Sequence, residues 1–189
     1  MDFIKKHWSN ILFFGLIIFM FTPAGMPLRA WLIKGVSFIT SRVENLEIDK
    51  DERIQLSDYN WQLIDQEGNP VDFSSFKGKV LLINNWATTC PPCVAEMPSL
   101  QKLYDSRKDE VFFLFIAHDR PGRVKDFLQK NNLHLPVYYI QSAVPKELKS
   151  PRIPTTFIID KQGNIVVHKT GAVDWDSSQV HKILDKYAG

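Results

Sequence analysis

The sequence predicts an α/β protein in which helices flank a central mixed β-sheet. Short apolar runs of strand length alternate with amphipathic helical periods over most of the chain. Near the C-terminus, two strand-like runs at 155–160 and 165–168 flank the turn residues Gly163 and Asn164, which predicts an antiparallel pair. The 189-residue chain is 44% hydrophobic with a net charge of +2. This composition is typical of a globular domain and indicates neither disorder nor a nucleic-acid partner.

The first elements of the domain are expected to be a hairpin, a buried strand and a helix. Residues 61–64 and 70–73 flank a Glu-Gly-Asn turn at 67–69, which predicts the hairpin. The apolar run 80–86 is typical of a buried strand. Apolar residues then recur at helical spacing and predict a helix from Pro91 to about Lys108; they are Val94, Met97, Leu100, Leu103 and Tyr104.

The second half of the chain repeats the alternation. A strand is expected at 111–117, a short helix at 122–131 and a short strand at 136–140. After the antiparallel pair, residues 177–187 are expected to close the chain as a helix. Three of its residues are spaced to face inward: Val180, Ile183 and Leu184.

The only two cysteines, Cys90 and Cys93, lie where the strand 80–86 gives way to the helix. Cys90 is expected at or next to the N-cap and Pro91 at the first helical position. Unpaired N–H groups and the helix dipole stabilise a thiolate there, and can move a cysteine pKa from about 8.5 to roughly 3.5–7.5. Cys90 is therefore expected to be the exposed nucleophile and Cys93 the resolving thiol. The alternatives are a metal site, for which zinc would require four ligands, or an inert local staple.

The residues around the pair resemble the active-site stretch of the TlpA-like and ResA-like membrane-anchored disulfide reductases. The resemblance is carried by Asn85-Trp86-Ala87-Thr88-Thr89-Cys90-Pro91-Pro92-Cys93, by Glu96-Met97-Pro98-Ser99-Leu100 and by Ile153-Pro154-Thr155-Thr156-Phe157-Ile158-Ile159-Asp160. It spans roughly Leu56 to the C-terminus. It implies a thioredoxin fold, in which helices flank a mixed sheet, with an N-terminal β-hairpin extension.

The resemblance implies roles for individual residues. Cys90 would attack a substrate disulfide and Cys93 would resolve the intermediate. Glu96 would be a buried acid that tunes the titration of the cysteines. Pro154 would be a cis-proline facing the disulfide, with Ile153 beside it shaping the substrate groove.

Two further residues belong to the expected substrate-binding surface, and the chain departs from the family at one of them. Trp86 would pack beneath the active-site turn. Thr89 stands where the family usually has an aromatic residue, so the surface around the nucleophile should be less apolar.

The chain also departs from thioredoxin itself in the buried part of the site. Asn84 occupies the place where thioredoxin has a buried acid, which leaves Glu96 as the carboxylate available to assist the resolving thiol.

The N-terminal part of the chain is expected to lie at a membrane. No Asp, Glu, Lys or Arg occurs between Lys6 and Arg29, and this stretch is about long enough to span a bilayer. We expect a cytoplasmic N-terminus at 1–6, a transmembrane anchor at 7–28, a linker at 29–52 and the thioredoxin-like domain at 53–189. A cleaved signal peptide is the alternative to the anchor. The acidic end of the linker could equally be a solvated first turn of the domain.

These expectations combine into a function. The protein is expected to be a single-pass inner-membrane thiol–disulfide oxidoreductase with its redox domain in the periplasm, reducing disulfide-bearing protein substrates. The resemblance implies no bound cofactor besides the redox-active Cys90–Cys93 pair, and a membrane thiol electron donor of the DsbD kind. Two alternatives stay open: a periplasmic oxidant or isomerase, and a copper- or partner-binding module on the same fold.

Overall fold

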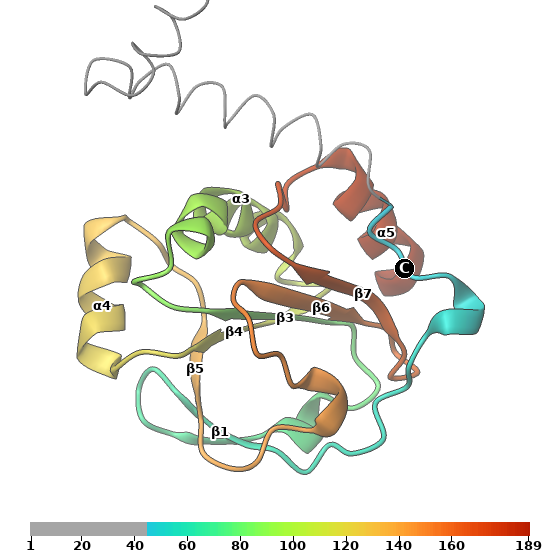
Figure 1. Ribbon diagram of the computed structural model, residues 1–189, viewed down its shortest axis with the longest axis horizontal. Helices are drawn as coiled ribbons and strands as arrows, with labels where there is room; N and C mark the ends of the chain where they lie inside the picture. The colour runs from blue at the N-terminus through green and yellow to red at the C-terminus, as the bar shows by residue number, and fades with distance from the viewer. Residues whose placement is uncertain (1–44) are drawn as a thin grey trace, which may run out of the picture. The chain divides into compact units, whose positions relative to one another are not determined.

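A seven-stranded mixed sheet forms the centre of the fold (Figure 1). The computed structural model describes residues 45–189, and these form one compact unit, Asn45–Gly189. The expected cytoplasmic N-terminus 1–6, the anchor 7–28 and the first part of the linker lie outside the described residues. Within 45–189, no helix is both long and apolar enough to cross a membrane.

The strands stand in the order β2-β1-β5-β4-β3-β6-β7. Their bounds are Gln62–Asp65 for β1, Pro70–Asp72 for β2, Leu81–Trp86 for β3, Phe112–Ala117 for β4, Val137–Ile140 for β5, Thr155–Ile159 for β6 and Ile165–Thr170 for β7. Strands β3, β4 and β5 are parallel neighbours, while β6 runs antiparallel to β3. The carboxyl ends of β3, β4 and β5 therefore lie beside the beginning of β6, at one end of the sheet.

Within residues 45–189, three helices and three short 3₁₀ turns surround the sheet. The helices are α3 at Pro91–Arg107, α4 at Pro121–Lys130 and α5 at Ser178–Ala188. The 3₁₀ turns are η2 at Lys50–Glu52, η3 at Phe73–Phe76 and η4 at Lys146–Leu148. Every element expected in the domain from the sequence is present, with each end within two residues of its expected position.

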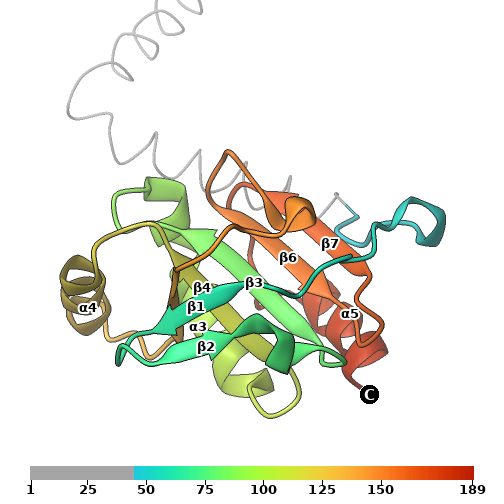
Figure 2. The ribbon, with the colours of Figure 1, turned by 90° about the horizontal axis from the view of Figure 1, so that it is seen from below.

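The sheet separates two apolar cores because alternate side chains of a strand point to opposite faces. On one face, Leu82 and Phe115 pack with residues of α3, α4 and α5. On the other face, Leu81 and Ile83 pack with residues of η3, η4 and the segment before β1. Figure 1 shows α3 and α5 over the first face, and Figure 2 shows β1 and β2 from below. Asn84 and Asn85 follow the same alternation, so one amide faces the helices and the other faces away.

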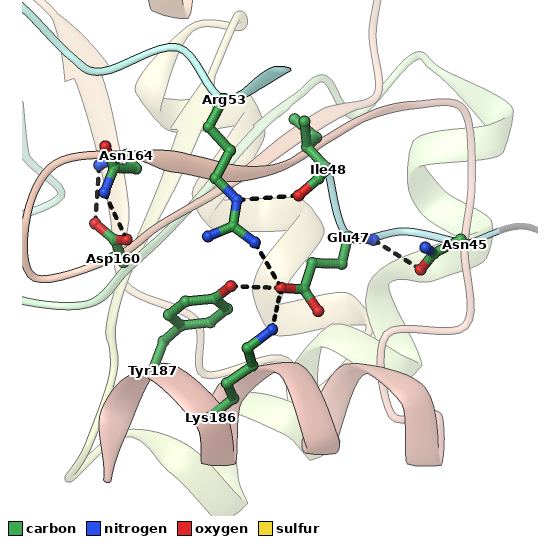
Figure 3. A network of polar contacts seen from close by, with 8 residues as sticks. All are labelled: Asn45, Glu47, Ile48, Arg53, Asp160, Asn164, Lys186 and Tyr187. Carbon is green, nitrogen blue, oxygen red and sulfur yellow. Dashed lines mark hydrogen bonds and ion pairs between the residues drawn. The ribbon is translucent and has the colours of Figure 1, made fainter. Parts of the chain in front are cut away.

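Residues 45–52, expected at the end of a linker, pack against the sheet. Leu46 is only 7% exposed, and the Ile48 amide donates to the Val166 carbonyl at 2.8 Å. The carboxylate of Glu47 accepts hydrogen bonds from Arg53, Lys186 and Tyr187, as Figure 3 shows. The folded unit thus extends to Asn45 and includes the acidic segment that precedes residue 53.

Candidate active site

Cys90 and Cys93 form a disulfide at the N-terminus of α3, with their Cα atoms 5.3 Å apart. Cys90 is the N-cap, and its Sγ accepts a hydrogen bond from the Cys93 amide at 3.3 Å. Pro91 fits the first helical position because no N–H partner is needed there. Cys90 is partly exposed, whereas Cys93 is 0% exposed. An incoming sulfur can therefore reach Cys90 but not Cys93.

The Ile153–Pro154 peptide bond is cis and lies at the same end of the sheet, just before β6. The register pairs Asn85 of β3 with Thr155 of β6, so Pro154 is beside the end of β3, from which the cysteine turn emerges. Pro154 is buried and Ile153 is partly buried. Ile153 and Cys90 both pack against the core on the helix side of the sheet.

Glu96 is at the centre of a buried hydrogen-bond network behind the disulfide. Its side chain belongs to α3 and is 2% exposed. Oε1 accepts from Asn84 Nδ2 at 2.9 Å, and Oε2 accepts from Trp175 Nε1 at 2.9 Å and from the Val173 amide at 3.3 Å. Asn84 Nδ2 also donates to Thr156 Oγ1 at 2.8 Å. The carboxyl group therefore ties α3 to β3 and to the loop before α5, and Asn84 extends the network to β6.

Burial raises the pKa of Glu96 from 4.5 to about 7, because it outweighs the opposing hydrogen bonds from Trp175, Asn84 and Val173. Cys93 lies three residues before Glu96 on α3, so both side chains are on the same side of the helix. Asn84 Oδ1 is buried and has no hydrogen-bond partner among the described residues. A carboxyl group that titrates near neutral pH thus lies close behind the buried thiol.

The turn that carries Cys90 is fastened to the end of β4. Thr88 donates to Asp119 Oδ2 from its backbone amide at 2.6 Å and from its hydroxyl at 2.8 Å. Arg123 Nη1 pairs with the other oxygen of Asp119 at 3.3 Å. Burial raises the pKa of Asp119, but the bonds from Thr88 and the charge of Arg123 outweigh it, so the net pKa is lowered. The carboxylate stays ionised and holds the turn.

The remaining residues around the turn differ in exposure. Trp86 is fully buried with its ring 5.6 Å from that of Phe127, and Thr89 is exposed. His118 shares a 3.1 Å hydrogen bond with Asn85 on the other face of the sheet. Between residues 45 and 189, no three His, Cys, Asp or Glu side chains come together as a metal site.

Sequence reasoning missed two residues that hold the site, Trp175 and Asp119. Trp175 lies 79 residues from the carboxyl group that it contacts, and Asp119 lies 31 residues from Thr88. The apolar periodicity that revealed the helices carries no signal for either contact. The position of Asp119, two residues after the end of a buried strand that runs parallel to β3, is the one clue the sequence offered.

Known proteins resemble the chain in sequence and in fold. The Redoxin family model matches residues 49–184. The thiol-disulfide oxidoreductase ResA of Bacillus cereus is 31% identical over 149 residues, covering 77% of this chain and 82% of ResA. The thioredoxin-like protein YneN of Bacillus subtilis is 28% identical over 123 residues, covering 63% of this chain and 71% of YneN.

Solved structures give the same picture of the fold. A thiol:disulfide interchange protein of the thioredoxin family from Chlorobium tepidum superposes with a TM-score of 0.57 at 25% identity, covering 72% of this chain and 98% of that one. A DsbF homologue from Corynebacterium diphtheriae gives a TM-score of 0.59 at 19% identity, covering 76% and 94%. The thioredoxin fold expected for the domain is confirmed.

Proposed function

Because the chain belongs to the Redoxin family and is a thiol–disulfide oxidoreductase like its ResA relatives, we propose that it is a membrane-tethered reductase of disulfides in exported proteins. The observation that carries this proposal is the difference in exposure within the cysteine pair. Cys90 is accessible at the N-terminus of α3, whereas Cys93 is buried one turn further on. This asymmetry suits an attacking thiol and a resolving thiol.

The reaction cycle begins with both cysteines reduced. The Cys90 thiolate, stabilised by the amides at the start of α3, attacks one sulfur of a substrate disulfide, and the second substrate sulfur leaves as a thiolate. Cys93 then loses its proton to solvent and attacks Sγ of Cys90, which releases the first substrate sulfur as a thiolate, and both substrate thiolates take up protons from solvent. Two electrons pass to the substrate, its disulfide becomes a dithiol, and the protein keeps the Cys90–Cys93 disulfide.

Glu96 acts in this cycle as a positioning and tuning residue. Its carboxyl group contacts Asn84, Trp175 and Val173 and shares a helix side with Cys93. A group with a pKa of about 7 exchanges its proton near neutral pH. Its charge state therefore sets the electrostatic environment in which Cys93 ionises.

The location and the electron donor are further parts of the proposal. The uncharged stretch between Lys6 and Arg29 supports a single-pass anchor in the inner membrane, with the redox domain in the periplasm. A reductase there needs a source of electrons to return the disulfide to the dithiol. A membrane thiol donor of the DsbD kind would fill this role, as the family resemblance implies.

The reduction potential of the Cys90–Cys93 pair tests the direction of the reaction. The full chain, purified in a neutral detergent, would be equilibrated with dithiothreitol or glutathione buffers and its thiols counted after alkylation. A potential near the value for thioredoxin, about −270 mV, would support a reductase. A potential near that of DsbA, about −120 mV, would instead identify an oxidant.

A further inference from the structure

A groove lies at the end of the sheet that carries the disulfide. One hollow of about 710 Å³ lies against residues 117–121, Arg123 and the end of β5. A second, of about 350 Å³, lies against Asn85, Val144 and residues 148–151. His118 and Ile140 line both hollows, so the two adjoin.

The groove adjoins the reactive turn through two segments. At one end, Asp119 holds Thr88, which is two residues before Cys90. At the other end, residues 148–151 lead into the loop that ends at the cis-proline Pro154. A polypeptide whose disulfide meets Cys90 would thus have a neighbouring stretch of its chain over this groove.

The charges along the groove are almost all positive. Arg120 and Arg123 line one hollow and Lys149 lines the other, while Arg152 is exposed on the loop before Pro154. Asp119 is the one acidic residue of the lining, and its carboxylate is already bound by Thr88 and Arg123.

Apart from Arg123, which pairs with Asp119, the basic residues beside the groove are not paired within the folded part. Throughout residues 45–189, no carboxylate forms an ion pair with Arg120, Lys149 or Arg152. Yet residues 45–189 contain about as many acidic as basic side chains. The basic residues are therefore in local excess beside the reactive sulfur, where they can attract a negatively charged partner.

We propose that this groove binds an acidic stretch of the substrate polypeptide next to its disulfide, with Arg120 and Lys149 as specificity-determining residues. The proposal rests on the proposed reductase function and names the substrate class for the same site. Ile140 and Val144 add an apolar wall between the two charged ends, which suits a peptide with mixed side chains. Complementary charge at a rim speeds association and discriminates between partners.

Two synthetic peptides test the proposal with the reduced full chain in neutral detergent. Each peptide is closed by one disulfide, and the two differ only in flanking glutamates or glutamines. We expect the second-order rate constant for reduction to be about tenfold higher for the glutamate peptide at low salt. This ratio should fall as salt rises from about 20 mM to about 300 mM, because salt screens exposed charges.

Reversing the charge of the groove residues tests whether they cause the difference in rate between the two peptides. The variant Arg120→Glu/Lys149→Glu should lose the tenfold ratio, and the milder Arg120→Gln/Lys149→Gln should reduce it. The matched control is Lys102→Glu/Lys182→Glu, which makes the same charge change at two exposed lysines on α3 and α5 and should keep the wild-type ratio.

Each contrary result has a distinct meaning. Equal rates for both peptides, or an unchanged ratio in both groove variants, would overturn the proposed acidic specificity while leaving the reductase intact. Failure to reduce either peptide would overturn the reductase function, and the specificity with it. Salt-sensitive binding of phosphatidylglycerol vesicles that the groove variants abolish, together with equal peptide rates, would assign the basic groove to the membrane instead.

Discussion

Asn84 Nδ2 donates a hydrogen bond to Glu96 Oε1 at 2.9 Å, and both side chains are buried behind the Cys90–Cys93 disulfide. The other amide atom, Asn84 Oδ1, has no partner among the described residues. The amide therefore donates to an ionised Glu96, and could accept from a protonated one only after rotating about its last side-chain bond. Rotation of Asn84 is needed only when the Glu96 proton is on Oε1, the oxygen that faces Nδ2.

Glu96→Gln should flatten the pH dependence of stability. The pKa of Glu96 is raised from 4.5 to about 7, so the folded protein holds this proton more tightly than the unfolded chain. The contribution of this proton to the free energy of unfolding is fully present below about pH 4.5. It is lost as the pH rises to about 7, a change of about 3 kcal/mol. Glutamine has no proton to lose, and its amide can satisfy Asn84 Oδ1 once Asn84 rotates. Urea unfolding of the wild type and of Glu96→Gln from pH 4.5 to 8 measures the difference in their free energies of unfolding.

The exposed carboxylate Asp109 provides the matched control for this experiment. Asp109→Asn also removes one carboxylate, but its stability should follow the wild-type curve. If Glu96→Gln also followed the wild-type curve between pH 4.5 and 7, Glu96 would not titrate in the range expected from its burial.

Trp175→Phe should raise the pKa of Glu96 above its wild-type value. The indole of Trp175 donates to Oε2 at 2.9 Å, and this bond favours the ionised carboxylate. NMR titration of ¹³C-labelled glutamate carboxyls would follow the midpoint directly. Trp61→Phe is the control, because the Trp61 indole is equally buried but has no partner in the described part of the chain. A midpoint that moved equally in both variants would argue against the hydrogen bond as the cause.

Cys93→Ala should trap substrates as mixed disulfides. Cys90 would still attack, but no resolving thiol would remain to release the substrate. Non-reducing electrophoresis and mass spectrometry would show covalent complexes linked through Cys90. Cys90→Ala should form none, because Cys93 is fully buried. Complexes of similar yield in Cys90→Ala would reverse the assignment of the two thiols.

Local patterns were enough to predict the elements and the cysteine pair. The strand before Cys90 and the helix after it are each defined by neighbouring residues, so hydrophobic periodicity could find them. The contacts that fasten the site are not local. Trp175 meets Glu96 across 79 positions, and Asp119 meets Thr88 across 31. Such contacts depend on how strands and helices pack, and no sequence spacing records them.

The composition of the segment before residue 53 fits a linker and a solvated first turn of the domain equally well. In the structure, Leu46 is buried and the Ile48 amide pairs with β7. The charge of Glu47 is met by Arg53 nearby and by Lys186 in α5. A carboxylate balanced by a distant part of the chain is indistinguishable in the sequence from one that faces water.

Asp119→Ala should loosen the cysteine turn and destabilise the protein by about 1–3 kcal/mol at neutral pH, because two hydrogen bonds from Thr88 would lose their acceptor. The net pKa of Asp119 is lowered, so its contribution is present above its ordinary value of 3.8 and is lost as pH falls through the folded-state pKa. Hydrogen exchange at the Thr88 amide should become faster. Thr88→Val, which removes only the hydroxyl bond, should have a smaller effect; an equal loss in both would mean that the amide bond contributes nothing.

A fragment that starts at Asn45 should be more stable than one that starts at Arg53. The longer fragment keeps the buried Leu46, worth roughly 1.5–3 kcal/mol on complete burial, and the Glu47 contacts drawn in Figure 3. Within it, Glu47→Gln should cost about 1 kcal/mol, since the ion pairs with Arg53 and Lys186 lose their charge.

Urea unfolding of the two fragments and of Asp51→Asn, a neighbouring exposed carboxylate, separates these contributions. Asp51→Asn should leave the stability of the longer fragment unchanged, because the aspartate makes no ion pair among residues 45–189. Equal stability of the two fragments would mean that residues 45–52 lie on β7 without stabilising it. The longer fragment could be more stable while Glu47→Gln leaves its stability unchanged. That result would assign the extra stability to the apolar burial of Leu46 and the strand pairing of Ile48.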